Sequence, residues 1–182
     1  MSEIGRYNTL KIVKRTDFGL YLDGGSDNDS GGNILLPNRY IPKDVPTEIG
    51  DKLLVFIYLD SDDRLIATTE APKAQVGEFA SLKVKDASQV GIFLDWGLPK
   101  DLLLPYSETK RTQKVGDYVV VYLYLDDKTQ RITATTYLDT HLGLREPNYC
   151  VGEVVNLLIA ARTDIGYKAI INNQHWGLIH NN

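Results

Sequence analysis

The chain has 182 residues, with 20 lysines and arginines against 24 aspartates and glutamates, and its formal net charge at pH 7 is -4. It contains one cysteine, which excludes a framework of internal disulfides, and it is too long for one small barrel. No apolar run approaches the roughly 20 residues of a membrane-spanning helix, and the N-terminal residues lack the apolar stretch of a signal peptide. We therefore expect a cytoplasmic protein with no membrane segment.

Strand patterns fill residues 1–70. Short alternating or β-branched stretches are separated by Gly, Asp, Asn and Pro, which favours strands over helices. A short turn, Asn38–Tyr40, is expected after the third strand. The five expected strands are Tyr7–Arg15, Phe18–Asp23, Asn33–Pro37, Leu53–Asp60 and Arg64–Thr68.

Residues 71–140 repeat this pattern with a closely similar sequence. The first copy contains LKIVKRTDFGLYLDGG and ends in ATT, and the second contains LKVKDASQVGIFLDWG and ends in the same ATT. Such self-similarity at a fixed period indicates one module that has been duplicated. The turn after the third strand is expected at Tyr106–Glu108. The corresponding strands are Glu78–Ala87, Gly91–Trp96, Asp101–Leu104, Tyr118–Leu125 and Arg131–Thr135.

A third copy begins within residues 141–182, after a linker, and covers only the first three strands. Five strands that close a small barrel, with a brief helical connection after the third, describe an OB fold. We expect an all-β chain of tandem five-stranded OB barrels, two complete and a third incomplete. Three strands alone are marginal, so we expect the third copy to pack on the second module or to pair with a neighbouring copy as a homo-oligomer.

An aromatic pair marks the second strand of the first module. Phe18 and Tyr21 are three residues apart around Gly19, a spacing that places them on opposite faces of a regular strand. A bulge at the glycine would bring both rings to one surface, where two bases of a single-stranded nucleic acid can stack. Arg15, together with Lys83 and Lys85 of the second module, would then supply contacts to phosphate. The alternative is that one of the rings fills the barrel core.

These residues resemble OB-fold modules of the S1 type. That pattern has two aromatics around a glycine, a histidine after the third strand, and an Asp followed four residues later by Arg in the hairpin between the last two strands. In the first module the resemblance covers Phe18, Gly19, Tyr21, Asp60 and Arg64, and Pro37 stands where the histidine is expected.

The other two copies keep less of the pattern. In the second module, Val90 replaces the first aromatic, Pro105 replaces the histidine, and Trp96 is expected to compensate for the lost ring. The third copy has Ile165 and Lys168 at the ring positions and retains the histidine. The resemblance implies an RNA-binding surface made of Phe18, Tyr21, Asp60, Arg64, Phe93, Trp96, Asp127, Arg131, Arg15, Lys83, Lys85, Lys168 and His180.

The order of the modules, the repeated LYLD and ATT, and the linker YLDTHLGL are similar to the conserved virulence factor B family. Its members carry three S1-type modules followed by a winged-helix domain and are bacterial RNA-binding regulators of gene expression. The resemblance therefore implies binding of single-stranded RNA. It also implies that this chain is an N-terminal piece that lacks the winged helix.

Other function classes find less support in the sequence. The three histidines and Cys150 show no metal-ligand spacing, and adjacent acids such as Asp62 and Asp63 fall at expected hairpin turns. We expect no enzymatic activity, no metal and no cofactor. Because the charge is acidic rather than basic, stacking should contribute more to RNA affinity than charge does. A protein-interaction scaffold of degenerate OB barrels is the alternative.

Overall fold

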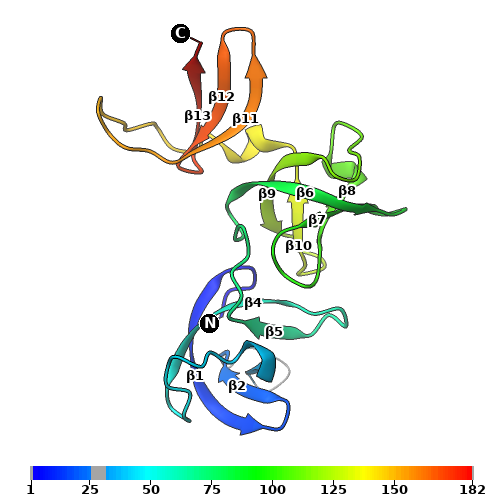
Figure 1. Ribbon diagram of the computed structural model, residues 1–182, viewed down its shortest axis with the longest axis vertical. Coiled ribbons are helices and arrows are strands. Elements are labelled where there is room, and N and C mark those ends of the chain that lie inside the picture. The colour runs from blue at the N-terminus through cyan, green and yellow to red at the C-terminus, as the bar shows by residue number, and fades with distance from the viewer. Residues whose placement is uncertain (1, 26–31, 182) are drawn as a thin grey trace. The chain divides into compact units, whose positions relative to one another are not determined.

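A computed structural model describes residues 2–25 and 32–181 of the chain. Within these residues the protein is all-β, and its strands form two closed barrels and a three-stranded sheet (Figure 1). This confirms the predicted fold class. No helix in the described ranges is long and apolar enough to cross a membrane.

The first barrel closes in the strand order β1-β2-β3-β5-β4. Strand β1 is long enough to pair with both β2 and β4, and a parallel contact between β3 and β5 at Leu35 and Ile66 completes the ring. A single 3-10 turn, η1 (Asn38–Tyr40), follows β3, as the sequence predicts. The strands are β1 (Tyr7–Thr16), β2 (Gly19–Asp23), β3 (Asn33–Pro37), β4 (Lys52–Leu59) and β5 (Leu65–Thr68).

The second barrel has the same topology, in the order β10-β8-β7-β6-β9, and η2 (Tyr106–Glu108) stands at the predicted turn. In both barrels the predicted strand boundaries agree with the observed ones to within one residue. Alternation explains this agreement, because inward residues such as Leu20 and Leu22 are fully buried and the residues between them are not. The strands are β6 (Phe79–Ala87), β7 (Gly91–Asp95), β8 (Leu102–Pro105), β9 (Tyr118–Leu125) and β10 (Ile132–Thr135).

The third copy forms a sheet of β11 (Leu157–Thr163), β12 (Gly166–Ile171) and β13 (His175–His180), preceded by η3 (Leu138–His141). The sheet packs on the second barrel through a buried cluster of Phe79, Leu142 and Ile170. The Phe79 amide also donates a hydrogen bond to Asn173 Oδ1 at 2.9 Å. The prediction that the third copy packs on the second module is therefore confirmed.

A one-residue bulge interrupts the first strand of every copy, and not the second strand as predicted. Within β2 the pairing with β3 continues without a shift through Gly19, so the expected bulge at this glycine is wrong. Gly19 is required because the Leu36 carbonyl oxygen lies so close to its Cα that a methyl group would overlap it. Its φ of +152° is also a backbone conformation that other residues rarely adopt. The register shifts lie between Ile12 and Lys14, Val84 and Asp86, and Ile159 and Ala161.

The chain divides into two compact units that do not follow the repeat. Unit 1 contains the chain up to Val76 together with the segments Trp96–Asp101 and Leu125–Ile132. Unit 2 contains Gly77–Asp95, Leu102–Tyr124 and the chain from Thr133 onward. Two segments that belong to the second copy in sequence therefore pack with the first barrel in unit 1.

Candidate nucleic-acid interface

Phe18 is the most exposed aromatic side chain of the predicted surface, with 75% of its area accessible. It lies in the two-residue turn between β1 and β2, where Thr16 pairs with Gly19. Because a turn residue does not follow strand alternation, the ring is free to point outward. Turn geometry, rather than a bulge, exposes this ring. The alternative that Phe18 fills the barrel core is wrong.

Tyr21 lies on the outward face of β2, between the buried Leu20 and Leu22, and is half-buried. Its cross-strand neighbours are Lys14 on β1 and Leu35 on β3, so a cation and an apolar side chain flank the ring. Tyr21 also lines a groove of about 490 Å³ on the first barrel. The groove is lined by Tyr21, Asn33, Leu35, Asp60, Asp63, Arg64, Leu65 and Ile66.

The predicted hairpin pair of Asp60 and Arg64 forms at the edge of this groove. Arg64 donates from Nε and Nη2 to Asp60 Oδ2 at 3.1 and 2.9 Å, and from Nη2 to Asp62 Oδ2 at 2.8 Å. Burial raises the pKa of Asp60, but hydrogen bonds from the backbone and side chain of Arg64 and from the Asp62 amide outweigh it and hold that pKa below its usual range. These contacts orient the Arg64 guanidinium, and the carboxylates of Asp60 and Asp62 balance its charge.

In the second module, Phe93 occupies the position of Tyr21 and is half-buried, whereas its neighbour on β6 is Asp86 instead of a lysine. Val90, 65% exposed, takes the place of Phe18. This surface therefore has one ring, an aliphatic turn residue and an acidic neighbour. It is less aromatic and more acidic than the corresponding surface of the first barrel.

The predicted hairpin positions of the second module, Asp127 and Arg131, do not correspond to Asp60 and Arg64 of the first. The Asp126 amide donates to the Arg131 carbonyl oxygen at 2.9 Å, just as the Asp60 amide donates to Arg64, so Asp126 is the structural counterpart of Asp60. This hairpin is one residue longer, which misaligns a match made by spacing. Asp127 is exposed at the turn.

Arg131 instead binds Asp63 within unit 1. Its Nε donates to Asp63 Oδ1 at 3.0 Å and its Nη2 donates to Asp63 Oδ2, which makes a two-point contact. Lys100 Nζ lies 3.7 Å from the same carboxylate. The hydrogen bond from Arg131 holds the pKa of Asp63 below its usual range. Arg131 therefore has a structural partner that the hairpin pattern does not predict.

Trp96 is also placed differently from the prediction. It is 3% exposed, its ring contacts Phe56 and Tyr58 of the first barrel, and Nε1 donates to the Lys100 carbonyl oxygen at 2.6 Å. The expectation of an exposed ring that compensates for Val90 is wrong, because Trp96 lies at the end of β7 where the chain leaves the second barrel and packs within unit 1.

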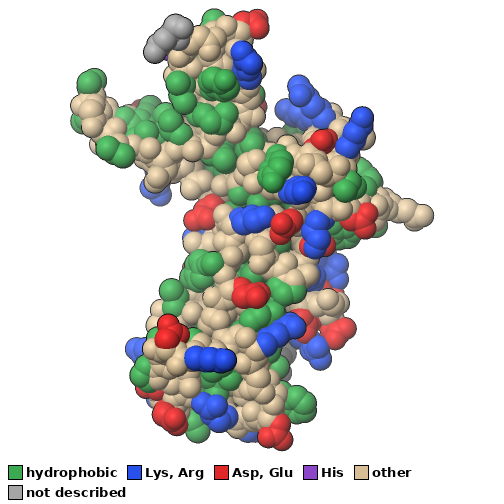
Figure 2. All heavy atoms as spheres, in the orientation of Figure 1, with side chains coloured by type: hydrophobic (Ala, Val, Ile, Leu, Met, Phe, Trp, Pro, Cys, Tyr) green, Lys and Arg blue, Asp and Glu red, His purple; other side chains and the backbone are tan. Residues whose placement is uncertain are grey.

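The three predicted phosphate contacts are exposed on first strands. Arg15 on β1 donates from Nη2 to the Thr47 carbonyl oxygen at 2.8 Å, which fixes its side chain against a neighbouring loop. Lys83 and Lys85 lie on β6, and Lys83 is the cross-strand partner of Asp95. Figure 2 shows that basic and acidic side chains alternate over the first barrel on the face drawn, instead of gathering into a continuous basic surface.

In the third copy, His180 is exposed and is the cross-strand partner of Gly166. In the first two copies the equivalent partners are Pro37 and Pro105, so the pairing supports the alignment of these positions made from sequence. Lys168 does not extend into solvent alone, because its Nζ lies 3.8 Å from the centroid of the Trp176 ring.

Sequence reasoning missed one basic loop. The segment from Thr109 to Lys114 reads TKRTQK and follows η2, and Figure 2 shows basic side chains over this part of the second barrel. Lys110 and Arg111 line a groove in unit 2 together with Trp176. Three cations within six residues indicate a basic loop in the sequence itself. The S1-type pattern does not include this loop, because it describes only the second strand, the position after the third strand and the last hairpin.

Comparison with known families identifies the repeated module. The model of the S1 domain matches residues 4–70 and again residues 76–137. The chain belongs to the S1 domain family. The two matched S1 domains coincide with the two closed barrels, and the third sheet lies outside the matched residues.

Among curated proteins, the chain is 39% identical to the uncharacterized protein YitL of Bacillus subtilis over 101 residues, which cover 55% of this chain and 32% of YitL. It is 24% identical to conserved virulence factor B of Staphylococcus epidermidis over 144 residues, covering 75% of this chain and 47% of that protein. Conserved virulence factor B of Staphylococcus aureus is 28% identical over 101 residues. The predicted resemblance is confirmed, and the chain spans less than half the length of these relatives.

A solved structure has a similar fold over nearly the whole chain. It is a multidomain protein with nucleic acid binding domains from Streptococcus pneumoniae, and the match has a TM-score of 0.61 at 20% identity. The match covers 97% of this chain and 62% of the other. The fold of this chain therefore also occurs in an experimentally determined structure.

Proposed function

We propose that this chain binds single-stranded RNA, and that the outer face of the first S1 barrel is its principal stacking surface. Membership of the S1 domain family supports a nucleic-acid-binding role in general. The observation that carries the finer proposal is the exposed Phe18 ring, because a phenyl group that is 75% accessible contributes nothing to the barrel core. Tyr21 adds a second ring, with Lys14 beside it.

Stacking, rather than charge, is expected to provide most of the affinity at this face. The groove beside Tyr21 contains Asp60, Asp63 and Arg64, and all three are already engaged in ion pairs. Among the described residues that line the groove, Arg64 is the only cation, so little positive charge is available there to neutralise phosphates. Base stacking on an aromatic ring contributes roughly 1–3 kcal/mol per base and tolerates any sequence. The proposed site is therefore weakly salt-dependent and not base-specific.

Fluorescence anisotropy with a labelled pyrimidine-rich RNA tests this proposal. Phe18→Ala and Tyr21→Ala should each weaken binding by about 5- to 150-fold, the range that corresponds to losing one stacked base at roughly 1.4 kcal/mol per tenfold. Leu54→Ala is the matched control, because Leu54 is an apolar side chain on the same barrel that is 62% exposed and lies outside the groove. Equal affinity of all four proteins would refute the stacking surface.

We further propose that RNA binding serves post-transcriptional regulation in a bacterial cytoplasm. The curated relatives include proteins named conserved virulence factor B, and the chain spans less than half of their length. Weak sites on linked modules combine into tighter binding, so the longer protein should bind RNA more strongly than these residues alone. Transcripts that crosslink to the protein in cells should change in half-life or translation when its gene is deleted. Unchanged transcripts would argue against a regulatory role.

A further inference from the structure

A second groove lies in unit 2. It has a volume of about 410 Å³ and is bordered by the loop after η2, the outer side of β9, and the third sheet. The walls therefore come from two parts of the chain that the buried cluster of Phe79, Leu142 and Ile170 holds together. The lining residues are Thr109, Lys110, Arg111, Thr112, Gln113, Tyr118, Val119, Val120, Thr136, Leu138, Ala160, Ala161 and Trp176.

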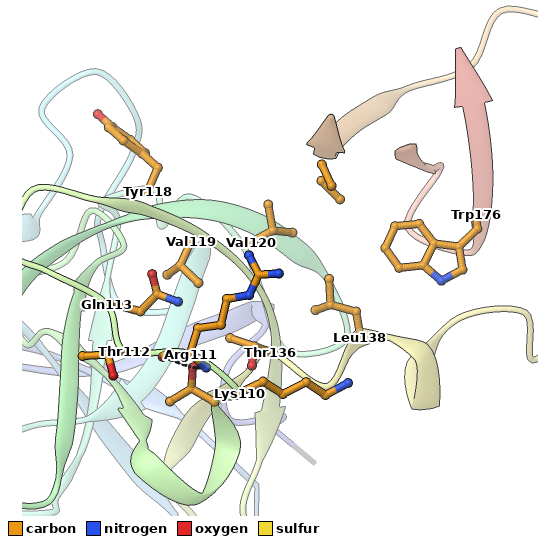
Figure 3. A pocket seen from close by; sticks show the side chains of 13 residues that line it. Lys110, Arg111, Thr112, Gln113, Tyr118, Val119, Val120, Thr136, Leu138 and Trp176 are labelled. Carbon is orange, nitrogen blue, oxygen red and sulfur yellow. Dashed lines mark hydrogen bonds between the residues drawn. The ribbon is translucent and has the colours of Figure 1, made fainter. Parts of the chain in front are cut away.

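Two cations extend from the loop into this groove. Figure 3 shows the Arg111 side chain reaching across the opening near Val120, and Lys110 extending past Leu138 on the same side as Trp176. Among the described residues, neither cation forms an ion pair, and Lys110 Nζ contacts the Tyr137 ring at 5.1 Å. Both are exposed. Their charges are thus available to a ligand, unlike those of Arg64 and Arg131.

An oriented aromatic ring lines the opposite side, and a third cation lies against this ring. Trp176 Nε1 donates to Asp139 Oδ1 at 2.9 Å, which fixes the indole plane. Lys168 Nζ lies 3.8 Å from the centroid of this ring. The Asp139 oxygen that accepts this hydrogen bond is therefore already engaged. The groove therefore combines two lining cations with a partly exposed ring that is held in place, and Lys168 adds a third positive charge against that ring.

We propose that this groove binds the phosphate backbone of single-stranded RNA, with Lys110, Arg111 and Lys168 as phosphate contacts and Trp176 as a surface for a base or ribose. The proposal rests on the proposed function and adds a second contact to the same strand. Cations interleaved with aromatic rings are the features that bind single strands, because counterions are released from phosphates while bases stack. The first barrel supplies mainly stacking, and this groove supplies the missing charge.

The salt dependence of binding tests the proposal. On single-stranded nucleic acid each phosphate contact contributes about 0.7 to the slope of log K against log salt, so Lys110→Gln/Arg111→Gln should lower the slope by about 1.4. If the variant and the wild type bind equally at about 1 M salt, a slope difference of about 1.4 makes the variant roughly 25-fold weaker at about 0.1 M salt. Lys168→Gln alone should lower the slope by about 0.7 and weaken binding about fivefold.

The probe is a fluorescein-labelled oligouridylate of about 16 nucleotides, the upper end of OB-fold site sizes, titrated with the full chain between about 50 and 200 mM salt. Lys43→Gln/Lys52→Gln is the matched control, since it removes two exposed lysines outside the groove. An effect of Lys110→Gln/Arg111→Gln no larger than that of the control would overturn the proposal.

The two proposals fail in distinguishable ways. If wild type binds and Phe18→Ala weakens it, while Lys110→Gln/Arg111→Gln matches the lysine control, the groove proposal is wrong and the stacking surface stands. If Phe18→Ala has no effect and the loop variant lowers both affinity and slope, the groove proposal stands and the stacking surface is wrong. Absence of RNA binding by the wild type refutes both, and leaves an acidic protein as the partner of the basic loop.

Discussion

Replacing Trp96 with alanine removes a side chain that is 3% exposed from the aromatic cluster of unit 1. The centroid of its ring lies 5.7 Å from that of Phe56 and 6.5 Å from that of Tyr58, with interplanar angles of 75° and 88°. Such edge-to-face pairs add stabilisation beyond burial. The indole N–H also loses its bond to the Lys100 carbonyl oxygen, which is 2.6 Å long.

The nearly complete burial of the Trp96 side chain sets the expected loss of stability. Truncation of a buried Trp to Ala costs about 3–5 kcal/mol, so we expect Trp96→Ala to lower the free energy of unfolding of unit 1 by about 4 kcal/mol. Trp96→Phe keeps a ring in the cluster and loses mainly the hydrogen bond and some volume. Its cost should be nearer to 1.5 kcal/mol, since one hydrogen bond contributes about 0.5–1.5 kcal/mol.

Amide hydrogen exchange resolves which unit is affected. At roughly 1.4 kcal/mol per tenfold, a loss of about 4 kcal/mol speeds exchange of β4 amides by almost a thousandfold. Strand β6 in unit 2 is the internal reference. Burial raises the pKa of Tyr58 to about 12, so Trp96→Ala should also shift its titration toward the ordinary value of 10.0. An acceleration in β4 below about tenfold would refute the packing argument.

Two further predictions concern the first barrel. Gly19→Ala places a methyl group against the Leu36 carbonyl oxygen at positive φ and should cost about 3 kcal/mol in a urea titration, whereas Gly116→Ala, which has positive φ but open space, should cost only about 1–2 kcal/mol. Because the folded-state pKa of Asp60 lies below its unfolded value of 3.8, its ion pair stabilises the fold above that pH and is lost as pH falls through the folded pKa. Asp60→Asn should flatten the decline in melting temperature below about pH 4, and an unchanged decline would contradict this assignment.

Local patterns were sufficient to predict both barrels. Alternation around residues such as Leu20 and Leu22 identifies each strand, because the buried face must be apolar in every copy. The sequence prediction of a bulge at Gly19 is wrong. The glycine is required by the Leu36 carbonyl of the neighbouring strand, and the sequence of β2 alone does not report that contact.

The errors at the site share a physical cause. Trp96 is buried by Phe56 and Tyr58, which precede it by about forty residues, and no local pattern reports such a contact. Spacing matches Arg131 to a carboxylate four residues away, whereas the hairpin hydrogen bonds make Asp126 the counterpart of Asp60 and the Arg131 side chain binds Asp63. The exposure of the Phe18 ring was predicted, yet it results from turn geometry and not from a bulge.

The docking of Trp96–Asp101 and Leu125–Ile132 onto the first barrel has a consequence for dissecting the protein. Severing the chain after Val76, where the repeat suggests a boundary, would strip the indole from Phe56 and Tyr58 and leave a bare aromatic patch. Such a fragment would be prone to self-association for reasons unrelated to its natural role. Fragments for binding studies should therefore extend at least through Thr135, the end of β10, because the repeated module and the packed unit have different ends.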